Sequence, residues 1–348
     1  MYRYIGNKTK LLPEIIGTIH DSVGENSTIA DVMAGTGVVS AELKRRGYRV
    51  IAADIMTYSR HHLASQLLAN SAPSFTALKD AGIIYESSYE AVLAFLNQIP
   101  GKTSFFFNEF SEAGQPKNGC SSRKYFTPEN AARIDAIREE IETWVRSGLV
   151  SGIEESVLKH TLILAVNKIA NISGTYGYFL SSYSDNAREP IILEPVNFVY
   201  SSRIDHVVMQ GYAEDLAVKI KADLCYIDPP YMKRQYAANY HILETIARGD
   251  FPDAVGKSGL RNWWDQHSKL CTKTRGLQSL AKIIDSMNCP KFLISYSEDG
   301  LFTIEQLREC FEKFGEVSVS EIDYTRFRSN NSPLPKNIKE YIIQVCKN

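Results

Sequence analysis

Apolar positions near the start of the chain predict a strand, a turn, a helix and a second strand. Residues 28–33 form a short apolar run that fits a buried strand, and residues 38–46 carry apolar positions at helical spacing. The helix should end at Gly47, a residue suited to a helix C-cap. The second strand, "RVIAAD", closes on Asp54. Short buried strands that alternate with helices predict an α/β protein with a parallel, doubly wound sheet.

The alternation stops between about residues 85 and 200, where aromatic, Ser- and Gly-rich loops surround two helices. The first helix should have Thr127 as its N-cap and Pro128 as its first residue. Its apolar positions form one stripe suited to core packing: Ile134, Ile137, Ile141 and Trp144. The second helix is expected near residues 154–171, and an irregular hairpin in residues 174–193. We interpret this block as an insertion with its own small core.

The alternation of strands and helices resumes after residue 200. Apolar runs in "HVVMQGYAEDL", "ADLCYID", "KFLISYS", "EVSVSEIDY" and "EYIIQVC" predict five further strands, which makes seven in all. We therefore expect a seven-stranded, Rossmann-like domain in two parts, residues 1–84 and 200–348. Residues 85–199 would be the mainly helical region inserted between them.

The composition predicts the general class of the protein and the compartment in which it works. The chain has 348 residues, of which 44% are hydrophobic and 23% charged, as in an ordinary soluble globular protein. It contains no apolar run long enough to span a membrane and no secretion signal at its N-terminus. Six scattered cysteines without a CxxC pair predict neither a metal site nor a disulfide framework. We expect a cytoplasmic protein without a membrane partner or a metal.

The distribution of charge along the chain distinguishes one basic stretch. The formal net charge is −1, which argues against a protein that coats nucleic acid. Residues 255–282 nevertheless hold six Lys or Arg against one Asp, interleaved with Trp263, Trp264 and His267. This stretch is either a solvated loop face or a surface that contacts phosphates.

A glycine turn after the first strand is the first candidate site. "DVMAGTG" places Gly35 and Gly37 between a buried strand and a helix N-terminus, where a ligand can approach the backbone. The turn lacks the Lys-Ser/Thr of a nucleotide phosphate loop. Asp54, at the tip of the second strand, can accept hydrogen bonds from ribose hydroxyls. These residues fit NAD and S-adenosylmethionine equally, and glycines of a purely structural turn are the alternative.

The second candidate site is "DPPY", at the end of the apolar strand "CYI". The amino group of adenine is a poor nucleophile, because its lone pair is delocalised into the ring. Two acceptors that each take one N–H can redirect that lone pair, and the Asp228 carboxylate and the Pro229 carbonyl are such a pair. Pro230 stiffens the turn, and Tyr231 offers a ring for a base to stack on.

Taken together, these motifs resemble the adenine-N6 DNA methyltransferases of the Dam-like, alpha group, over nearly the whole chain. "YIGNKTKLLPEI" looks like their N-terminal cofactor motif, "AEDL" like the segment near the cofactor adenine, and "YIDPPY" like the catalytic tetrapeptide. The motif order, with the insertion before the catalytic strand, is that of the alpha group. One departure is Met33, where Phe is common and contacts the cofactor.

The resemblance implies a Rossmann-like methyltransferase fold, S-adenosylmethionine as cofactor, and Asp228, Pro229, Pro230 and Tyr231 as catalytic residues. The implied cofactor-binding residues are Tyr4, Gly6, Asn7, Lys8, Asp31, Met33, Ala34, Gly35, Thr36, Gly37, Asp54, Ile55, Asp215, Leu216 and Asp228. The insertion is implied to be the target-recognition region. The basic residues that we expect to contact DNA are Lys117, Arg123, Lys124, Lys233, Arg261, Lys273 and Arg275.

The implied function is sequence-specific methylation of a flipped-out adenine in double-stranded DNA, as the protective enzyme of a restriction-modification system. A cognate restriction endonuclease acting on the same site would then be a partner. Three alternatives stay open: methylation of another amino group, such as that of an RNA adenine, a cytosine N4 or a protein glutamine; a non-enzymatic DNA-binding module; and an NAD-dependent oxidoreductase. Asp228 and the long insertion favour DNA adenine.

Overall fold

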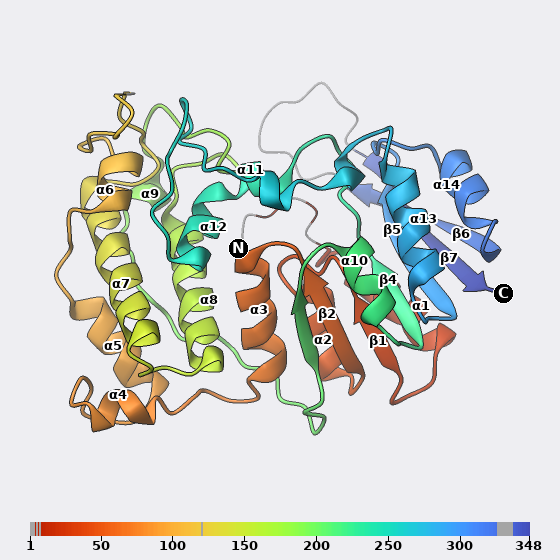
Figure 1. Cartoon of the computed structure of the whole chain (residues 1–348), viewed down its shortest axis with the longest axis horizontal. Helices are drawn as coiled ribbons and strands as arrows, with labels where there is room; N and C mark the ends of the chain where they lie inside the picture. The colour runs from red at the N-terminus through yellow and green to blue at the C-terminus, as the bar shows by residue number, and fades with distance from the viewer. Residues whose placement is uncertain (1–3, 5, 7, 120, 326–336) are drawn as a thin grey trace. The chain divides into compact units, whose positions relative to one another are not determined.

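The computed structural model describes the chain except residues 1–3, 5, 7, 120 and 326–336. The chain divides into two compact units, each of which is described by itself. The sheet unit comprises residues 6–63, 199–236 and 266–348. The helical unit comprises residues 1–5, 64–198 and 237–265. Figure 1 shows the sheet of the first unit and the helices of the second.

Seven strands form one sheet, two before the inserted residues and five after them, as the sequence predicts. The sheet has the strand order β3-β2-β1-β4-β5-β7-β6. Five strands, β1 to β5, pair in parallel, as a doubly wound sheet requires. The strands are β1 Thr28–Asp31, β2 Arg49–Asp54, β3 Val207–Gln210, β4 Leu224–Ile227, β5 Lys291–Ser297, β6 Gly315–Thr325 and β7 Asn337–Lys347.

The prediction of a parallel sheet is wrong for one edge, where the strands are antiparallel. β7 runs antiparallel to both of its neighbours, β5 and β6, so the sheet is mixed. From residue 315 to 320, β6 alternates between half-buried and exposed positions. Alternation of this kind is typical of antiparallel strands with one face toward water. The signal was present in "EVSVSEIDY", whereas the parallel strands are apolar on both faces.

Helices cover both faces of the sheet. Alternate strand residues, such as Ala30, Ile51 and Cys225, join one apolar cluster with α10, α13 and α14. The intervening residues face the other side, where α1 and α2 lie against each other. This arrangement buries both faces of the parallel part of the sheet. The helices are α1 Leu12–Ser22, α2 Val38–Arg45, α10 Ala213–Leu216, α13 Gly276–Ser286 and α14 Ile304–Phe311.

The helical unit packs around two long antiparallel neighbours, α7 and α8. The Thr127 hydroxyl accepts the Asn130 N–H, and Pro128 is the first residue of α7, as predicted. The predicted stripe of α7 is fully buried. The remaining elements are α3 Thr57–Leu68, which passes from one unit to the other, α4 Thr76–Asp80, α5 Tyr89–Gln98, α6 Phe105–Phe110, α7 Pro128–Arg146, α8 Gly152–Ile169, α9 Asp185–Arg188, α11 Tyr236–Asn239 and α12 His241–Arg248.

The hairpin expected in residues 174–193 is wrong. This segment contains no strand, only the short helix α9. Backbone groups of this segment form hydrogen bonds with side chains instead of with a neighbouring strand. The Asn130 amide donates to the carbonyls of Ala187 and Glu189 and accepts the Ile191 N–H. The Asn97 amide pairs in the same way with the backbone of Leu193. Because these amides satisfy the segment's polar groups, it needs no partner strand.

The units differ from the expected domain boundaries in two places. The helical unit begins near residue 64 rather than 85, because part of α3 and all of α4 belong to it. It also includes residues 237–265, which follow the DPPY segment in the chain. The boundary at 198 lies one residue from the expected one. The insertion is therefore larger and less continuous than the change in composition suggests.

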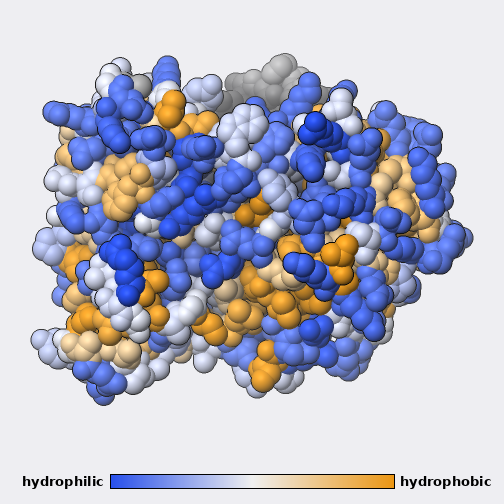
Figure 2. All heavy atoms as spheres, viewed as in Figure 1, coloured by the Kyte–Doolittle hydropathy of each residue, from blue (hydrophilic) through white to orange (hydrophobic). Residues whose placement is uncertain are grey.

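Figure 2 shows hydrophilic residues interspersed with apolar ones on one face of the molecule. Within the described residues, no helix is long and apolar enough to cross a membrane. Nor do His, Cys, Asp and Glu side chains gather there into a group that could hold a metal ion.

Candidate active site

Three carboxylates stand at the carboxyl ends of neighbouring strands in the sheet unit. Asp31 ends β1 and Asp54 ends β2, while Asp228 directly follows β4. The sheet order puts β2 on one side of β1 and β4 on the other. Ligands of open α/β sheets bind where the strand order reverses in this way. The predicted cofactor and DPPY motifs therefore meet at the topological switch point.

The glycine turn adopts a conformation that favours glycine. Gly35 has φ of 55° and Gly37 has φ of 79°, both in the left-handed region. The Asp54 carboxylate holds this turn from the side, since it accepts the Gly35 N–H at 2.8 Å and the Met56 N–H at 2.8 Å. Asp54 is thus oriented by the backbone of the turn.

Asp31 carries a buried oxygen that lacks a hydrogen-bond donor. The Ser40 hydroxyl donates to Oδ2 at 2.7 Å, but Oδ1 has no partner among the described residues. The side chain is only 1% exposed. Burial raises the pKa of Asp31 to about 7, and the charges of Asp228 and Asp54 act in the same direction. A buried acceptor without a donor marks a place that a cationic ligand can fill.

Asp228 is held through one of its two oxygens. Oδ1 lies 3.1 Å from Lys8 Nζ and accepts the Ser295 hydroxyl at 3.0 Å. The Ser295 hydroxyl lies 3.0 Å from the Tyr226 hydroxyl. No described residue donates to Oδ2. Burial raises the pKa of Asp228, and Lys8 and Ser295 offset part of this effect. Among the described residues, the second oxygen is therefore open to a further hydrogen-bond donor.

Lys8 is a buried cation in contact with the DPPY segment. It is 6% exposed, and its Nζ also lies 3.9 Å from Glu340 Oε2 and 5.2 Å from the centroid of the Tyr231 ring. Burial lowers the pKa of Lys8, but the neighbouring negative charges, above all Asp228, outweigh it and raise the pKa overall. Lys8 stays protonated at physiological pH.

Tyr231 is fixed from several sides. Its ring packs edge to face on Tyr296, with centroids 5.9 Å apart, and its carbonyl accepts the Leu301 N–H at 2.9 Å. A Cβ on Gly6, which has φ of 75°, would come within 3.0 Å of the Tyr236 hydroxyl and 3.9 Å of the Tyr231 hydroxyl. Glycine at position 6 thus lets the N-terminal motif approach the DPPY segment.

The other predicted cofactor residues lie in varied surroundings. Met33 packs against the apolar cluster of the sheet, and Leu216 is buried in that cluster. Asp215 is exposed and pairs with Lys282 at 3.1 Å. The Ile55 carbonyl accepts the side chain of Gln266 at 3.2 Å. Ala34 and Thr36 are half-buried in the glycine turn.

Two residues of the predicted N-terminal motif lie outside the described part of the sheet unit. Tyr4 belongs to the helical unit, where its ring stacks on Tyr240 with centroids 4.7 Å apart. Asn7 lies outside the described residues. Their roles next to a cofactor stay predictions.

Two of the residues predicted to contact DNA are buried. Arg123 is fully buried, pairs with Glu109 at 2.7 Å and donates to the carbonyls of Ala254 and Gly256. Arg261 is 5% exposed and pairs with Asp250 at 2.7 Å. Both guanidinium groups tie loops of the helical unit together. Basic residues in loops are usually solvated, and here tertiary packing buries them.

The other predicted DNA contacts lie on the surface. In the helical unit, Lys117 pairs with Asp253 at 3.3 Å and Lys124 with Glu112 at 3.2 Å, so each has an acidic neighbour. In the sheet unit, Lys233, Lys273 and Arg275 are exposed.

No role was predicted from the sequence for four side chains that support the site: Ser40, Tyr226, Ser295 and Glu340. Tyr226 and Ser295 lie within strands that read as buried runs, and Glu340 lies on β7. Their polarity inside apolar strands was the available signal, because a buried polar group needs a partner.

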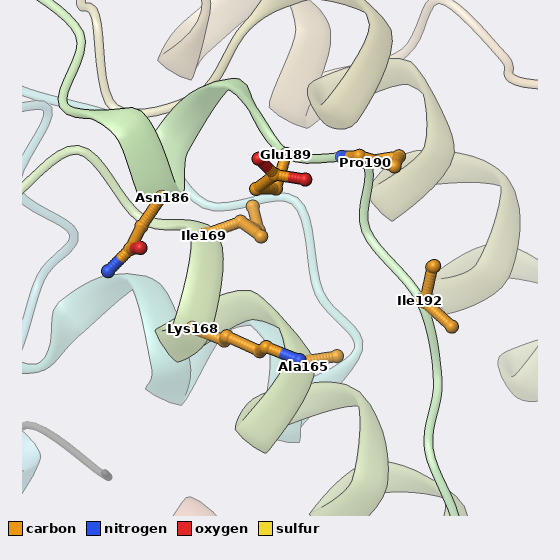
Figure 3. A pocket seen from close by; sticks show the side chains of 7 residues that line it. All are labelled: Ala165, Lys168, Ile169, Asn186, Glu189, Pro190 and Ile192. Atoms are coloured by element: carbon orange, nitrogen blue, oxygen red, sulfur yellow. The ribbon is translucent and has the colours of Figure 1, made fainter.

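A cavity of about 130 Å³ occurs in the helical unit, apart from these residues. Figure 3 shows its lining side chains, among them Lys168, Asn186 and Glu189. The Lys168 ammonium is paired with Glu194 at 2.8 Å. None of the predicted site residues lines this cavity.

The family model for D12 class N6 adenine-specific DNA methyltransferases matches residues 4–323. The chain belongs to this family.

Curated relatives of this D12 class methyltransferase are modification enzymes of similar sequence. It is 33% identical to the type II methyltransferase M.FokI of Planomicrobium okeanokoites, over 99% of this chain and 52% of that protein. It is 32% identical to M.NlaIII of Neisseria lactamica, over 94% of this chain and 93% of that protein. The chain thus spans about half of M.FokI but nearly all of M.NlaIII. Among solved structures, magnesium protoporphyrin IX methyltransferase from Synechocystis PCC 6803, with bound SAM, aligns at a TM-score of 0.33 and 6% identity over 97% of this chain and 77% of that one.

Proposed function

We propose that this protein methylates the N6 amino group of a flipped-out adenine in double-stranded DNA, with S-adenosylmethionine as the methyl donor. The observation that carries the proposal is the position of Asp228 at the switch point of the sheet, with Oδ1 held by Lys8 and Ser295. Membership of the D12 class supports the choice of adenine as the substrate. We further propose a role as the modification enzyme of a restriction-modification system, in the cytoplasm.

The residues around the glycine turn fit S-adenosylmethionine. This cofactor carries an ammonium, a sulfonium and a ribose with two hydroxyls. The buried Oδ1 of Asp31 can accept the ammonium, and the Asp54 carboxylate is oriented to accept from the ribose. The glycines leave the backbone open to close approach. When bound, the cofactor supplies an electrophilic methyl group.

Asp228 and Pro229 would activate the adenine amine by accepting its two N–H groups. Lys8 and Ser295 fix the Asp228 carboxylate through Oδ1 and leave Oδ2 for the amine. An amine whose protons are held in this way can direct its lone pair out of the ring plane. The same carboxylate stabilises the positive charge that the nitrogen gains, until one proton leaves. Catalysis would then rest on positioning and electrostatics.

Tyr231 would provide the face against which the extruded base stacks. Its contacts with Tyr296 and Lys8 restrict the ring before the base arrives. A preordered aromatic ring loses little conformational entropy on binding, and stacking on it contributes roughly 1–3 kcal/mol per base.

A basic surface next to Asp228 would contact DNA phosphates. Two segments of the sheet unit are joined by a reciprocal pair, since Gln235 donates to the Ser268 carbonyl and accepts the Ser268 N–H, both at 2.9 Å. The Cys271 thiol also donates to the Arg234 carbonyl. These bonds bring together the exposed side chains of Lys233, Arg234, Lys269, Lys273 and Arg275. Five cations on one short surface favour a polyanion.

We propose the helical unit as the target-recognition region and a restriction endonuclease of the same specificity as a partner. Support comes from the relatives of this chain, which are named as type II methyltransferases and modification methylases.

The test is transfer of a labelled methyl group from S-adenosylmethionine to DNA, RNA and protein, followed by nucleoside and amino acid analysis. We expect label in N6-methyladenine of double-stranded DNA only. Label in RNA adenine, in N4-methylcytosine or in methylglutamine would assign another amine, and no transfer by a folded protein would refute the proposal.

A further inference from the structure

We propose that Glu340 is a positioning residue for methyl transfer, which balances the charge of Lys8 so that Asp228 presents an uncompensated negative charge to the reacting amine. The inference rests on the function proposed above and adds a residue to it. Glu340 is the first residue of the predicted strand segment "EYIIQVC", and no role was predicted for it from the sequence.

The geometry places Glu340 beside Lys8. Glu340 lies on β7 opposite Ser297 of β5, is 5% exposed, and directs Oε2 to within 3.9 Å of Lys8 Nζ. Oε2 has no hydrogen-bond donor among the described residues, while the Ser297 hydroxyl hydrogen-bonds the Glu340 carboxylate. A buried carboxylate without full hydrogen bonding is costly unless a cation lies near it. Lys8 is that cation.

The charges explain what Glu340 adds. Lys8 and Asp228 alone sum to zero, and a neutral pair attracts a developing cation only weakly. With Glu340 the cluster sums to −1. When the nitrogen accepts the methyl group, the electron pair of the broken carbon–sulfur bond would stay on sulfur, and the nitrogen would be positive until one of its protons passes to water. A net negative cluster in a buried site stabilises that charge.

Other titratable groups face this cluster. Asp31 adds a negative charge near Asp228, Tyr226 reaches it through Ser295, and the Tyr231 ring lies beside Lys8. Asp299 adds a negative charge near Glu340. Lys8 is the cation in contact with both Asp228 and Glu340, so the effect of Glu340 on the amine passes through Lys8.

Glu340→Gln keeps the side-chain shape and removes its charge. We expect the single-turnover rate of methyl transfer to fall about tenfold, with the dissociation constants for S-adenosylmethionine and DNA changed less than about twofold. The acid limb of the rate–pH profile should move to lower pH, since loss of a neighbouring negative charge makes Asp228 easier to ionise. Glu340→Asp restores the charge and should recover part of the rate.

Glu321→Gln is the matched control, because Glu321 is exposed on the adjacent strand β6, and its profile should equal that of the wild type. An acid limb that does not move in Glu340→Gln, or Glu340→Asp no faster than Glu340→Gln, overturns the inference. A wild-type protein that methylates no adenine overturns the proposed function instead.

If Glu340→Gln does not fold, Ser297→Ala replaces it. Loss of the Ser297 hydroxyl raises the pH at which Glu340 takes up a proton, because that hydrogen bond lowers the pKa of Glu340. The pH at which the rate falls should therefore rise. An unchanged profile in folded Ser297→Ala contradicts the inference.

Discussion

Each unit buries a lysine between two carboxylates, but the two lysines are partnered differently. In the helical unit, Lys159 Nζ lies 2.7 Å from Glu142 and 2.8 Å from Glu155, and it donates to the Ala247 carbonyl at 2.8 Å. In the sheet unit, Lys8 Nζ lies 3.1 Å from Asp228 but 3.9 Å from Glu340. Lys159 has three acceptors within 2.8 Å, whereas Lys8 has one close and one distant acceptor among the described residues.

The difference concerns the acceptors around each ammonium. The Lys159 ammonium joins α7, α8 and the end of α12 through three close acceptors. The Lys8 cluster retains acceptors for other partners, namely Asp228 Oδ2 and the buried Glu340 Oε2. Incomplete hydrogen bonding occurs in both clusters, because the buried Glu142 Oε1 also lacks a hydrogen-bond donor among the described residues. The contact of Lys8 with Asp228 at the switch point of the sheet is therefore what distinguishes its cluster.

The largest effect should come from Asp228→Ala, which removes the acceptor for the amine. We expect methyl transfer to fall at least about a thousandfold, or about 4 kcal/mol of barrier stabilisation. Binding of S-adenosylmethionine and DNA should stay within about threefold of wild type, because neither depends mainly on this oxygen. Single-turnover kinetics and equilibrium titration measure the two quantities. A rate within tenfold of wild type would refute the proposed role of Asp228.

The two lysines should differ in how their loss affects methyl transfer. Lys159→Met leaves Glu142 and Glu155 buried without a cation, and we expect a loss of about 3 kcal/mol in the free energy of unfolding. Lys8→Met should lower the free energy of unfolding by a similar amount, because it leaves Glu340 buried without its cation. Only Lys8→Met should also slow methyl transfer. Urea unfolding and single-turnover rates test both, and equally slow methyl transfer by a folded Lys159→Met variant would contradict the comparison.

Much of the fold, and several residues of the candidate site, could be predicted from local sequence. The strands β1 and β2, the helix between them, Gly35, Gly37, Asp54 and Asp228 follow from short spacings that depend only on neighbouring residues. The cap and the buried stripe of α7 are equally local. All of these lie where the pattern places them.

Local sequence could not predict contacts between residues that lie far apart in the chain. Glu340 and Ser295 lie on β7 and β5, far from Lys8 in the chain, and only the sheet register brings them together. Arg123 and Arg261 sit in loop-like segments, yet distant carbonyls and carboxylates bury them. The antiparallel direction of β7 likewise depends on its pairing and not on its composition.

Each unit also contains a carboxyl group whose pKa is raised, so pH should affect the two units differently. Burial raises the pKa of Asp31 to about 7 and that of Asp135, in the helical unit, to about 6. Both groups bind a proton more tightly in the folded protein, so their contribution to stability is lost as pH rises through these values. Only Asp31 should affect the cofactor. We expect the affinity for S-adenosylmethionine to weaken about tenfold from pH 8 to pH 6.

Calorimetric titration at several pH values measures this dependence. Asp31→Asn should remove the pH dependence of cofactor binding. Asp135→Asn should retain this dependence, because the Asp135 carboxylate is hydrogen-bonded to the N–H groups of Ser104, Phe106 and Phe107 and should bind no cofactor. A dependence that survives in Asp31→Asn would show that another group binds the ammonium.

The smallest effect concerns the arginines on the two units. Arg275 is exposed on the basic surface of the sheet unit, and Arg123 is buried in the helical unit. Arg275→Glu should lower the slope of log affinity against log salt for DNA by about 1, since one phosphate contact releases about one counterion. Arg123→Met should leave that slope unchanged while it lowers the melting temperature, because Glu109 loses its partner. DNA titrations between low and moderate salt distinguish the two arginines. If Arg123→Met changes the slope and Arg275→Glu does not, the phosphate surface lies on the helical unit, and burial in the free protein is a poor guide to its DNA contacts.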